Sequence, residues 1–354
     1  MAGNHHSNIA IFIPHNGCPH RCAFCNQRTI SGAVSQPTAQ DVKAAVNTAL
    51  SSPKFEGGNA EIAFFGGSFT AIDREYMIEL LEAAHEFIMS GQVAGIRIST
   101  RPDAIDDEIL RTLKKHGVTS IELGAQSMRD DVLELNRRGH TAQDVINASQ
   151  LIKKYGFSLG LQMMTGLYGD DNVGARYTAR QLAALRPDTV RIYPTVVLEG
   201  TELAEKMRSG EYLPQGYEAA SELCAQLLRF FEQKRIKVIK LGLHASDGVE
   251  GSMVGGAYHP AFRELCEGIL YYRLIRSTLS EQYPDGGNFV VYVPKSDISK
   301  ATGQKKCIIS RLALDGWHVV IKGEDAIDGK ERRKCKIEPV HQQDSPASAA
   351  DHRH

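Results

Sequence analysis

The feature that most constrains the fold is a regular alternation of apolar runs and helical patterns over the first 195 residues. Six short apolar runs predict buried strands, at residues 8–14, 60–67, 95–100, 120–126, 157–164 and 189–195. Amphipathic helical patterns stand between them, at residues 38–50, 73–88, 106–117, 141–156 and 175–187. Such alternation requires a parallel sheet with right-handed crossovers. Six units are fewer than the eight of a closed barrel, so we expect an α/β fold built on a partial, TIM-like (β/α)6 barrel. Its chemistry should lie at the carboxyl ends of the strands.

The pattern changes after residue 200. Helical patterns at 214–234 and 260–282 flank an apolar run at 236–244, and strand patterns at 287–294 and 316–323 enclose a polar helical pattern at 295–314. We therefore expect three parts: a core, an extension that covers the barrel mouth and ends in a small α+β appendage, and a disordered tail. Their expected bounds are residues 1–235, 236–335 and 336–354.

The bulk properties indicate an ordinary globular chain. The formal net charge is -1, so no overall field favours nucleic acid or a membrane surface. No apolar run reaches the roughly 18 residues of a membrane span. The first residues, "MAGNHHSN", lack the basic and apolar regions of a signal peptide. We expect a cytoplasmic protein with no membrane partner, in a compartment that keeps thiols reduced.

Three of the seven cysteines fall within one short stretch, "CPHRCAFC", directly after the first predicted strand. They are Cys18, Cys22 and Cys25. The others are isolated in the sequence: Cys224, Cys266, Cys307 and Cys335. In a reducing compartment a tight cysteine cluster indicates a metal or catalytic site rather than disulfides. No fourth cysteine completes the C-x3-C-x2-C spacing. His15 and His20 flank the loop, so a zinc site with three cysteines and one histidine is the alternative.

This motif, with Phe24 before its last cysteine, resembles that of the radical S-adenosylmethionine (SAM) enzymes. The resemblance implies a [4Fe-4S] cluster held by Cys18, Cys22 and Cys25 as the catalytic metal centre. In that family SAM chelates the fourth iron, which explains why three thiolates suffice. Reductive cleavage of SAM then yields a 5′-deoxyadenosyl radical that abstracts a hydrogen. The protein mainly positions these groups and excludes competing reactions.

The resemblance also assigns cofactor contacts after successive strands. In "FFGGSFTA" the backbone would approach the methionine amino group of SAM, with a serine where the family often has an acidic residue. Arginines in "STRPDAI" and "RRGHTAQD" would be presented at the same rim, the second able to pair with the SAM carboxylate. The cofactor residues that the resemblance implies are Phe24, Gly66, Gly67, Ser68, Arg101, Gln126, Ser127, Arg138 and Gln162.

Several later segments narrow the resemblance. "STRPD", "ELGAQS", "RRGHTAQDV", "MMTGLYGDD" and "RIYPTVVLEGTEL" are similar to the radical domain of the Elongator catalytic-subunit family, in a bacterial form with a short C-terminal extension. That family modifies wobble uridine in transfer RNA, but 354 residues leave no room for its acetyltransferase domain. The resemblance implies tRNA as a partner and an electron donor such as flavodoxin or ferredoxin. Two alternatives stay open: a coproporphyrinogen-oxidase-like enzyme that acts on a small metabolite, and a non-catalytic iron–sulfur or zinc module.

Polar residues beyond the expected core are candidates for substrate contact near the barrel mouth. They are Lys240, His244, Tyr258, His259 and Arg263, of which His259 could carry a proton. The polar pattern of the appendage offers a candidate RNA face, with a solvated helix face as the alternative. Its basic residues are Lys295, Lys300, Lys305, Lys306 and Arg311.

Overall fold

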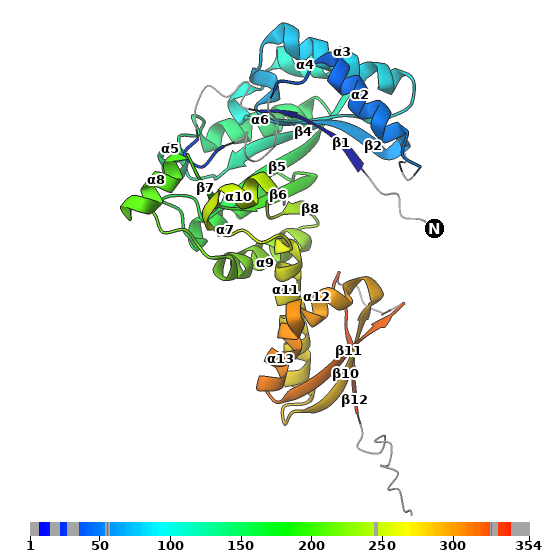
Figure 1. Ribbon diagram of the computed structural model, residues 1–354, viewed down its shortest axis with the longest axis vertical. Coiled ribbons are helices and arrows are strands. Elements are labelled where there is room, and N and C mark those ends of the chain that lie inside the picture. The colour runs from blue at the N-terminus through cyan, green and yellow to red at the C-terminus, as the bar shows by residue number, and fades with distance from the viewer. Residues whose placement is uncertain are drawn as a thin grey trace, which may run out of the picture. The chain divides into compact units, whose positions relative to one another are not determined.

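The chain folds into two compact units, Met1–Pro260 and Ala261–His354, in a computed structural model (Figure 1). The structure describes residues 7–14, 22–26, 35–53, 55, 57–243, 247–325, 327 and 332–340. The division after Pro260 differs from the core expected over residues 1–235. The difference arises because the strands between residues 236 and 256 belong to the first unit.

A seven-stranded parallel sheet forms the centre of the described first unit, in the order β1-β2-β3-β4-β5-β6-β8. The strands are β1 (Ser7–Ile13), β2 (Ala60–Gly66), β3 (Gly95–Thr100), β4 (Val118–Gln126), β5 (Ser158–Thr165), β6 (Thr189–Pro194) and β8 (Lys237–Leu241). The sheet curls into a half-barrel, so the expected partial barrel is confirmed (Figure 1). It has one strand more than expected, because β8 pairs in parallel with β6 from Thr189↔Lys237 to Ile192↔Leu241.

Helices cover the convex face of this sheet, and α2 contacts β1, α6 contacts β4 and β5, and α9 contacts β6 and β8. Their bounds are α2 (Ala39–Leu50), α3 (Arg74–Met89), α4 (Asp107–Lys115), α5 (Asp130–Leu135), α6 (Ala142–Lys154), α7 (Asn172–Ala184), α8 (Glu202–Ser209) and α9 (Tyr217–Gln233). The same four letters, "TAQD", begin α2 and α6. In both, threonine and aspartate form a capping box that satisfies amide groups of the first turn. These local signals explain why the predicted helix starts at Thr38 and Thr141 are confirmed.

Alternation along the strands separates two kinds of side chain. Every second residue faces the helices and is apolar and buried, for example Ile62, Ile96, Ile121, Leu159 and Val190. The residues between them face the concave side and include the charged groups described below. After β6, the short strand β7 (Val196–Leu198) pairs antiparallel with β9 (Met253–Gly256), which follows α10 (Asp247–Ser252).

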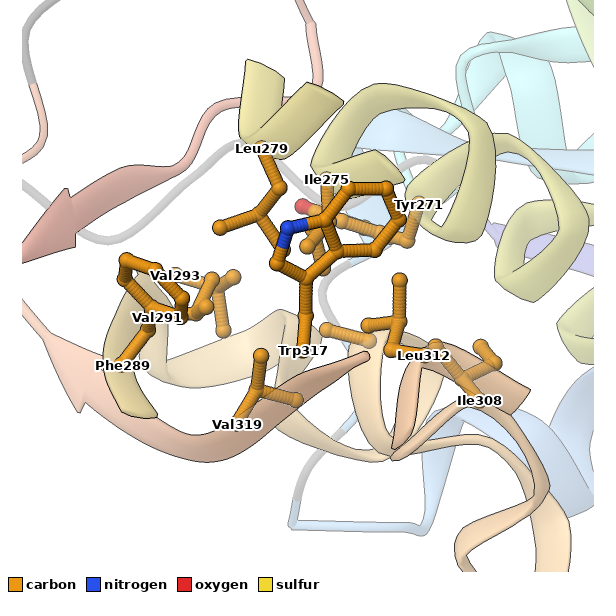
Figure 2. Close-up of a cluster of buried hydrophobic side chains, with 11 residues drawn as sticks. Tyr271, Ile275, Leu279, Phe289, Val291, Val293, Ile308, Leu312, Trp317 and Val319 are labelled. Carbon is orange, nitrogen blue, oxygen red and sulfur yellow. The ribbon is translucent and has the colours of Figure 1, made fainter. Parts of the chain in front are cut away.

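The second unit is a small α+β fold, as expected for the appendage. Its helices are α11 (Phe262–Gln282), α12 (Ile298–Thr302) and α13 (Cys307–Leu314), and its strands are β10 (Gly287–Pro294), β11 (Trp317–Glu324) and β12 (Lys336–Pro339). Strand β10 pairs in parallel with β11 and antiparallel with β12. Figure 2 shows the Trp317 ring among buried side chains of α11, α13 and the sheet, and its indole Nε1 donates to the Tyr283 carbonyl at 2.8 Å.

Two expectations for the second unit are wrong. The helical pattern at 295–314 is interrupted at Gly303, Lys305 and Lys306, which have φ values of +72°, +50° and +61°, so two helices form instead of one. The tail expected to be disordered from residue 336 begins with β12, because Lys336–Pro339 pairs with β10. Residues 341–354 lie outside the described part. Among the described helices, none has the combination of length and hydropathy that a membrane span requires.

Candidate functional site

The cysteine segment is anchored at the rim of the half-barrel by backbone hydrogen bonds. The Ala23 amide donates to the Asn136 carbonyl at 3.2 Å, and the Ala23 carbonyl accepts from the Leu203 amide at 2.8 Å. Cys22 and Cys25, on either side, are half-buried. These contacts hold two of the three predicted ligands between the end of α5 and the start of α8. Cys18 lies outside the described residues, as do His15 and His20.

Phe24 fixes the same segment through its side chain. Its ring packs against a buried apolar cluster behind the cysteines, which consists of Val197, Leu203, Ala204 and Tyr212. The Arg138 guanidinium lies over the ring, 6.0 Å from its centroid. Phe24 therefore joins the cysteine segment to α8 on one side and to Arg138 on the other.

Arg138 places a positive charge against the sulfur of Cys22. Its Nη1 donates to the Cys22 Sγ at 3.0 Å, and its Nη2 donates to the Gly124 carbonyl at 2.7 Å. A guanidinium at this distance stabilises negative charge on sulfur. The third nitrogen, Nε, is buried and has no hydrogen-bond partner among the described residues. Arg138 thus links the end of β4 to Cys22 and keeps one buried donor unused.

Gln126 provides a second unused polar atom at this rim. It ends β4 with a φ of +65°, a conformation that non-glycine residues rarely adopt and that is frequent at functional sites. Its Oε1 is buried without a partner in the described part of the chain. A Cβ on Gly124 would come within 3.1 Å of the Gln126 Nε2 and 3.4 Å of the Arg138 Nη2, so glycine leaves room for both side chains. Buried polar atoms are normally hydrogen-bonded. The unpaired Gln126 Oε1 and Arg138 Nε are therefore consistent with a polar ligand next to Cys22.

The glycine turn after β2 is tied to the end of β1. Gly66 has a φ of +106°, and a Cβ there would lie 3.0 Å from the Ile13 carbonyl oxygen. The Gly67 amide already donates to that oxygen at 2.7 Å. Ser68 is buried and precedes a short 3-10 helix, Phe69–Ala71. The turn therefore lies at the expected rim, and its contact with the methionine part of SAM stays a prediction.

Two other predicted cofactor residues are engaged within the protein. Arg101 donates through Nε and Nη2 to the Asp103 carboxylate at 2.6 and 2.7 Å, and through Nη2 to the Arg138 carbonyl at 3.3 Å. The Ser127 hydroxyl accepts from the Arg129 amide at 3.1 Å. In this arrangement Arg101 supports the backbone of Arg138. Its direct contact with SAM, like that of Ser127, stays a prediction.

A ladder of charged side chains that no sequence motif predicted lies on the concave face. Glu122 on β4 is only 1% exposed and accepts from Arg97 at 3.1 Å and from Arg191 at 2.5 and 2.8 Å. Arg97 also pairs with Glu61 at 2.7 Å. The Arg191 guanidinium lies 5.0 Å from the centroid of the Phe65 ring. We call Glu61, Arg97, Glu122 and Arg191 the charge ladder.

The charge ladder contains two glutamates and two arginines, so its formal charges cancel. One of its members, Glu122, contacts the predicted cofactor residue Gln162. Burial alone would raise the pKa of Glu61, but hydrogen bonds from Thr119 and Ser120 and the Arg97 charge hold it below its ordinary value. The Gln162 Nε2 donates to Glu122 at 3.0 Å and to the Ser99 hydroxyl at 3.3 Å. A signal for the ladder is present in the sequence, because each member interrupts an apolar strand at an inward-facing position.

The described candidate substrate residues lie on different segments of the chain. Lys240 lies on β8 opposite Arg191 in the strand register. The Tyr258 hydroxyl donates to Glu250 at 2.8 Å, and the His259 ring lies 5.6 Å from that of Tyr217. Arg263 belongs to the second unit, where its Nε donates to Glu267 at 3.0 Å. His244 lies outside the described residues.

Comparison with known proteins supports the expected relationship. Two family models match the chain: the Radical SAM superfamily over residues 12–181 and the Radical_SAM C-terminal domain over residues 187–271. A tRNA uridine(34) acetyltransferase of Methanocaldococcus jannaschii is 33% identical over 183 residues, which are 46% of this chain and 34% of the relative. Elongator complex protein 3 of Homo sapiens is 32% identical over 192 residues, 48% of this chain and 34% of that protein. The chain thus spans about a third of the length of these relatives.

A solved structure shows the same fold. The archaeal Methanocaldococcus infernus Elp3 with an N-terminal deletion matches with a TM-score of 0.59 and 22% identity, over 77% of this chain and 63% of that one. The two family matches together take in more than two thirds of the 354 residues. They also contain the cysteine segment, Arg138 and the charge ladder. The chain therefore belongs to the radical SAM superfamily of enzymes, whose members use SAM and a [4Fe-4S] cluster.

Proposed function

We propose that this chain cleaves SAM reductively at a [4Fe-4S] cluster held by Cys18, Cys22 and Cys25, and that its substrate is a transfer RNA. The observation that carries the first part is the hydrogen bond from Arg138 to the Cys22 sulfur at 3.0 Å, beside two buried polar atoms without partners. When bound, the cluster supplies the electron that breaks SAM and so starts hydrogen abstraction. Flavodoxin or ferredoxin as electron donor, and a cytoplasmic location, are part of the same proposal.

The protein's own groups define what the ligand next to them must offer. Gln162 donates both amide hydrogens, to Glu122 and to Ser99, so the group it can offer a ligand is its Oε1, which accepts a hydrogen bond. The Glu122 carboxylate fixes the orientation of the Gln162 amide. If the amide were flipped, its oxygen would face the carboxylate oxygens, and neither group could donate. Gln126 also presents an unused oxygen, whereas Arg138 presents an unused N–H. The site therefore suits a ligand with donor groups toward the glutamines and an acceptor toward the arginine, as SAM has in its amino, hydroxyl and carboxylate groups.

The proposed tRNA substrate rests on the named relatives. Both curated relatives reported above match in the radical SAM region, and one carries a tRNA uridine in its name. The half-barrel is the part of this chain that would carry the radical chemistry. A small-metabolite substrate is the alternative outcome of the test.

Neighbouring arginines allow a matched test of the SAM site. Arg138→Gln removes the contact with Cys22, whereas Arg137→Gln removes an arginine that is 65% exposed and pairs with Glu202 at 2.9 Å. Because hydrogen bonds to charged groups contribute about 1.5–3 kcal/mol, we expect Arg138→Gln to lower the rate of SAM cleavage about 10- to 100-fold. Arg137→Gln should stay within twofold of the wild type. The assay is release of 5′-deoxyadenosine after anaerobic reconstitution and reduction. Equal rates in both variants would contradict the placement of the site.

The substrate is tested separately by comparing the modified nucleosides of total tRNA from a deletion strain and its complemented control. We expect one modified nucleoside to be lost in the deletion strain and restored by the wild-type chain but not by Cys22→Ala. An unchanged nucleoside profile would refute the tRNA substrate and leave the SAM chemistry intact.

A further inference from the structure

The second unit extends well beyond the family match, which ends at residue 271. It contains an open depression of about 590 Å³ at the carboxyl end of β10. Its lining includes the three lysines Lys295, Lys305 and Lys306, and a single acidic residue, Glu264. We call this feature the lysine depression.

Two of these lysines are uncommitted. Lys305 and Lys306 are exposed and make no ion pair or hydrogen bond through their side chains with the described part of the chain. Lys295 has one exposed partner, Asp325, at 2.8 Å. Other basic groups on the same segment are used differently: Lys300 pairs with Glu267 and Asp297 at 3.0 and 2.6 Å, and Arg311 lies 4.2 Å over the Tyr272 ring. Of these five basic residues, Lys305 and Lys306 are therefore the two that have no side-chain partner in the described part of the chain.

The backbone presents the two free lysines in an unusual way. Lys305 and Lys306 are consecutive residues with positive φ, which side-chain-bearing residues adopt at a cost. The Lys306 amide donates to the Gly303 carbonyl at 3.1 Å. The helix that follows, α13, is fixed by Ile308 and Leu312 in the core that Figure 2 shows. The lysines therefore stand on a held segment and not on a loose loop.

The rest of the lining indicates the chemistry of a ligand. The hydroxyl-bearing residues Ser296, Ser299 and Thr302 also line the depression, and none of its described lining residues is aromatic. Ammonium and hydroxyl groups donate hydrogen bonds to phosphate oxygens. A nucleobase would need an aromatic surface to stack on. The depression suits phosphates of a chain that passes across it, and not a base inserted into it.

We propose that the lysine depression binds the phosphate backbone of the RNA substrate. This inference rests on the proposed action on tRNA and adds a docking surface outside the half-barrel. Contacts of this kind carry no base information, so they orient an RNA and do not select its sequence. The depression then contributes affinity that depends on salt.

The proposal can be tested by replacing Lys305 and Lys306 with glycine, which adopts their positive φ values without backbone strain. The double variant Lys305→Gly, Lys306→Gly removes both charges and suits the positive φ values, so its melting temperature should be equal to or higher than that of the wild type. The control is Lys322→Ala with Lys336→Ala, which removes the same number of exposed lysines from strands of the same unit, although Lys336 pairs with Glu338 at 2.7 Å. Binding of the full chain to unmodified tRNA is measured by fluorescence anisotropy between 50 and 200 mM salt.

We expect the glycine variant to bind tRNA about tenfold more weakly at low salt. The slope of log K against log salt should fall by about 1.4–1.8, which is two contacts at about 0.7–0.9 each. The control should keep the wild-type slope, and RNA-independent SAM cleavage should be unchanged in both variants. Wild-type binding with an unchanged slope in the glycine variant would overturn this inference alone. A wild-type chain that does not bind tRNA would refute the proposed substrate as well.

Two further results would overturn the assignment of the site. If the control variant weakened tRNA binding as much as the glycine variant, the loss would reflect net charge and not the lysine depression. Stabilisation by inorganic phosphate that is lost in the glycine variant, with tRNA affinity unchanged, would assign the depression to a small phosphorylated ligand.

Discussion

Replacement of Glu122 by glutamine should destabilise the first unit strongly, although the two side chains have nearly the same size. Glu122 is 1% exposed and is the acceptor for Arg97, Arg191 and Gln162. Glu122→Gln leaves Arg97 paired with Glu61 but removes the carboxylate partner of Arg191, whose side chain is 15% exposed. Removal of one partner from a buried ion pair costs about 3–5 kcal/mol. That is a large part of the roughly 5–15 kcal/mol by which domains are stable.

The assay is equilibrium unfolding in urea, followed by two signals. Far-ultraviolet circular dichroism reports both units, whereas the single tryptophan of the chain, Trp317, lies in the core of the second unit. With a slope of about 3 kcal/mol per molar urea, the midpoint for the first unit should fall by about 1–2 M. The fluorescence transition of Trp317 should stay in place. Both signals shifting together would contradict a loss confined to the first unit.

An exposed ion pair provides the control. Glu108→Gln removes the acid that Arg74 contacts at 3.1 Å, but the Glu108 side chain is 79% exposed. Exposed pairs contribute about 0–1 kcal/mol, so this midpoint should move by less than about 0.3 M. If Glu122→Gln moves the midpoint no further than Glu108→Gln, the charge ladder is solvated in solution and the reasoning is refuted.

Three further outcomes are expected. Burial raises the pKa of Asp170 from 3.8 to about 6, so the wild type should lose stability relative to Asp170→Asn as pH rises from 4 to 6. The free energy of unfolding of each protein is measured by urea titration. A difference between the two free energies that does not change with pH would contradict this. Burial, and then the Arg138 charge, lower the pKa of His140 to about 4, so its ring resonances should show no titration between pH 5 and 8, and a midpoint above 5.5 would be inconsistent. Burial raises the pKa of Cys224 to about 12, so Cys224→Ser should keep the iron content of the reconstituted wild type, whereas Cys22→Ser should lose it.

Local signals made most of the fold predictable. Period-2 apolar runs and capping residues such as Thr38 and Thr141 act within a few residues, and parallel pairing then follows from the alternation of strands and helices. The seventh strand, expected in the extension, pairs with β6 in the central sheet, and its place there is hidden in the sequence because β7 and α8 interrupt the alternation before β8. The break at Gly303 also has a signal, since glycine costs about 1 kcal/mol inside a helix, but the surrounding residues favour a helix well enough to mask it.

The site was predictable to a different extent. The family resemblance assigned both Cys22 and Arg138 to the cofactor site. In the structure the Arg138 Nη1 lies 3.0 Å from the Cys22 Sγ, although 116 positions separate them in the sequence. The charge ladder was missed because its members come from four strands, and their contacts depend on the register between strands. Register is set by the whole sheet, so no single window of sequence contains it.

The position of α11 bears on how this protein can be divided into transferable modules. The C-terminal family match ends at residue 271, in the middle of this helix, whereas the compact units separate at Pro260. A chain cut at residue 271 would keep Tyr271 but lose Ile275 and Leu279, the side chains that pack beside it. Half of an amphipathic helix would then expose apolar surface and invite aggregation. The end of the sequence match and the boundary between the packed units therefore differ. Gene fusions or domain exchanges with this chain should use the boundary at Pro260.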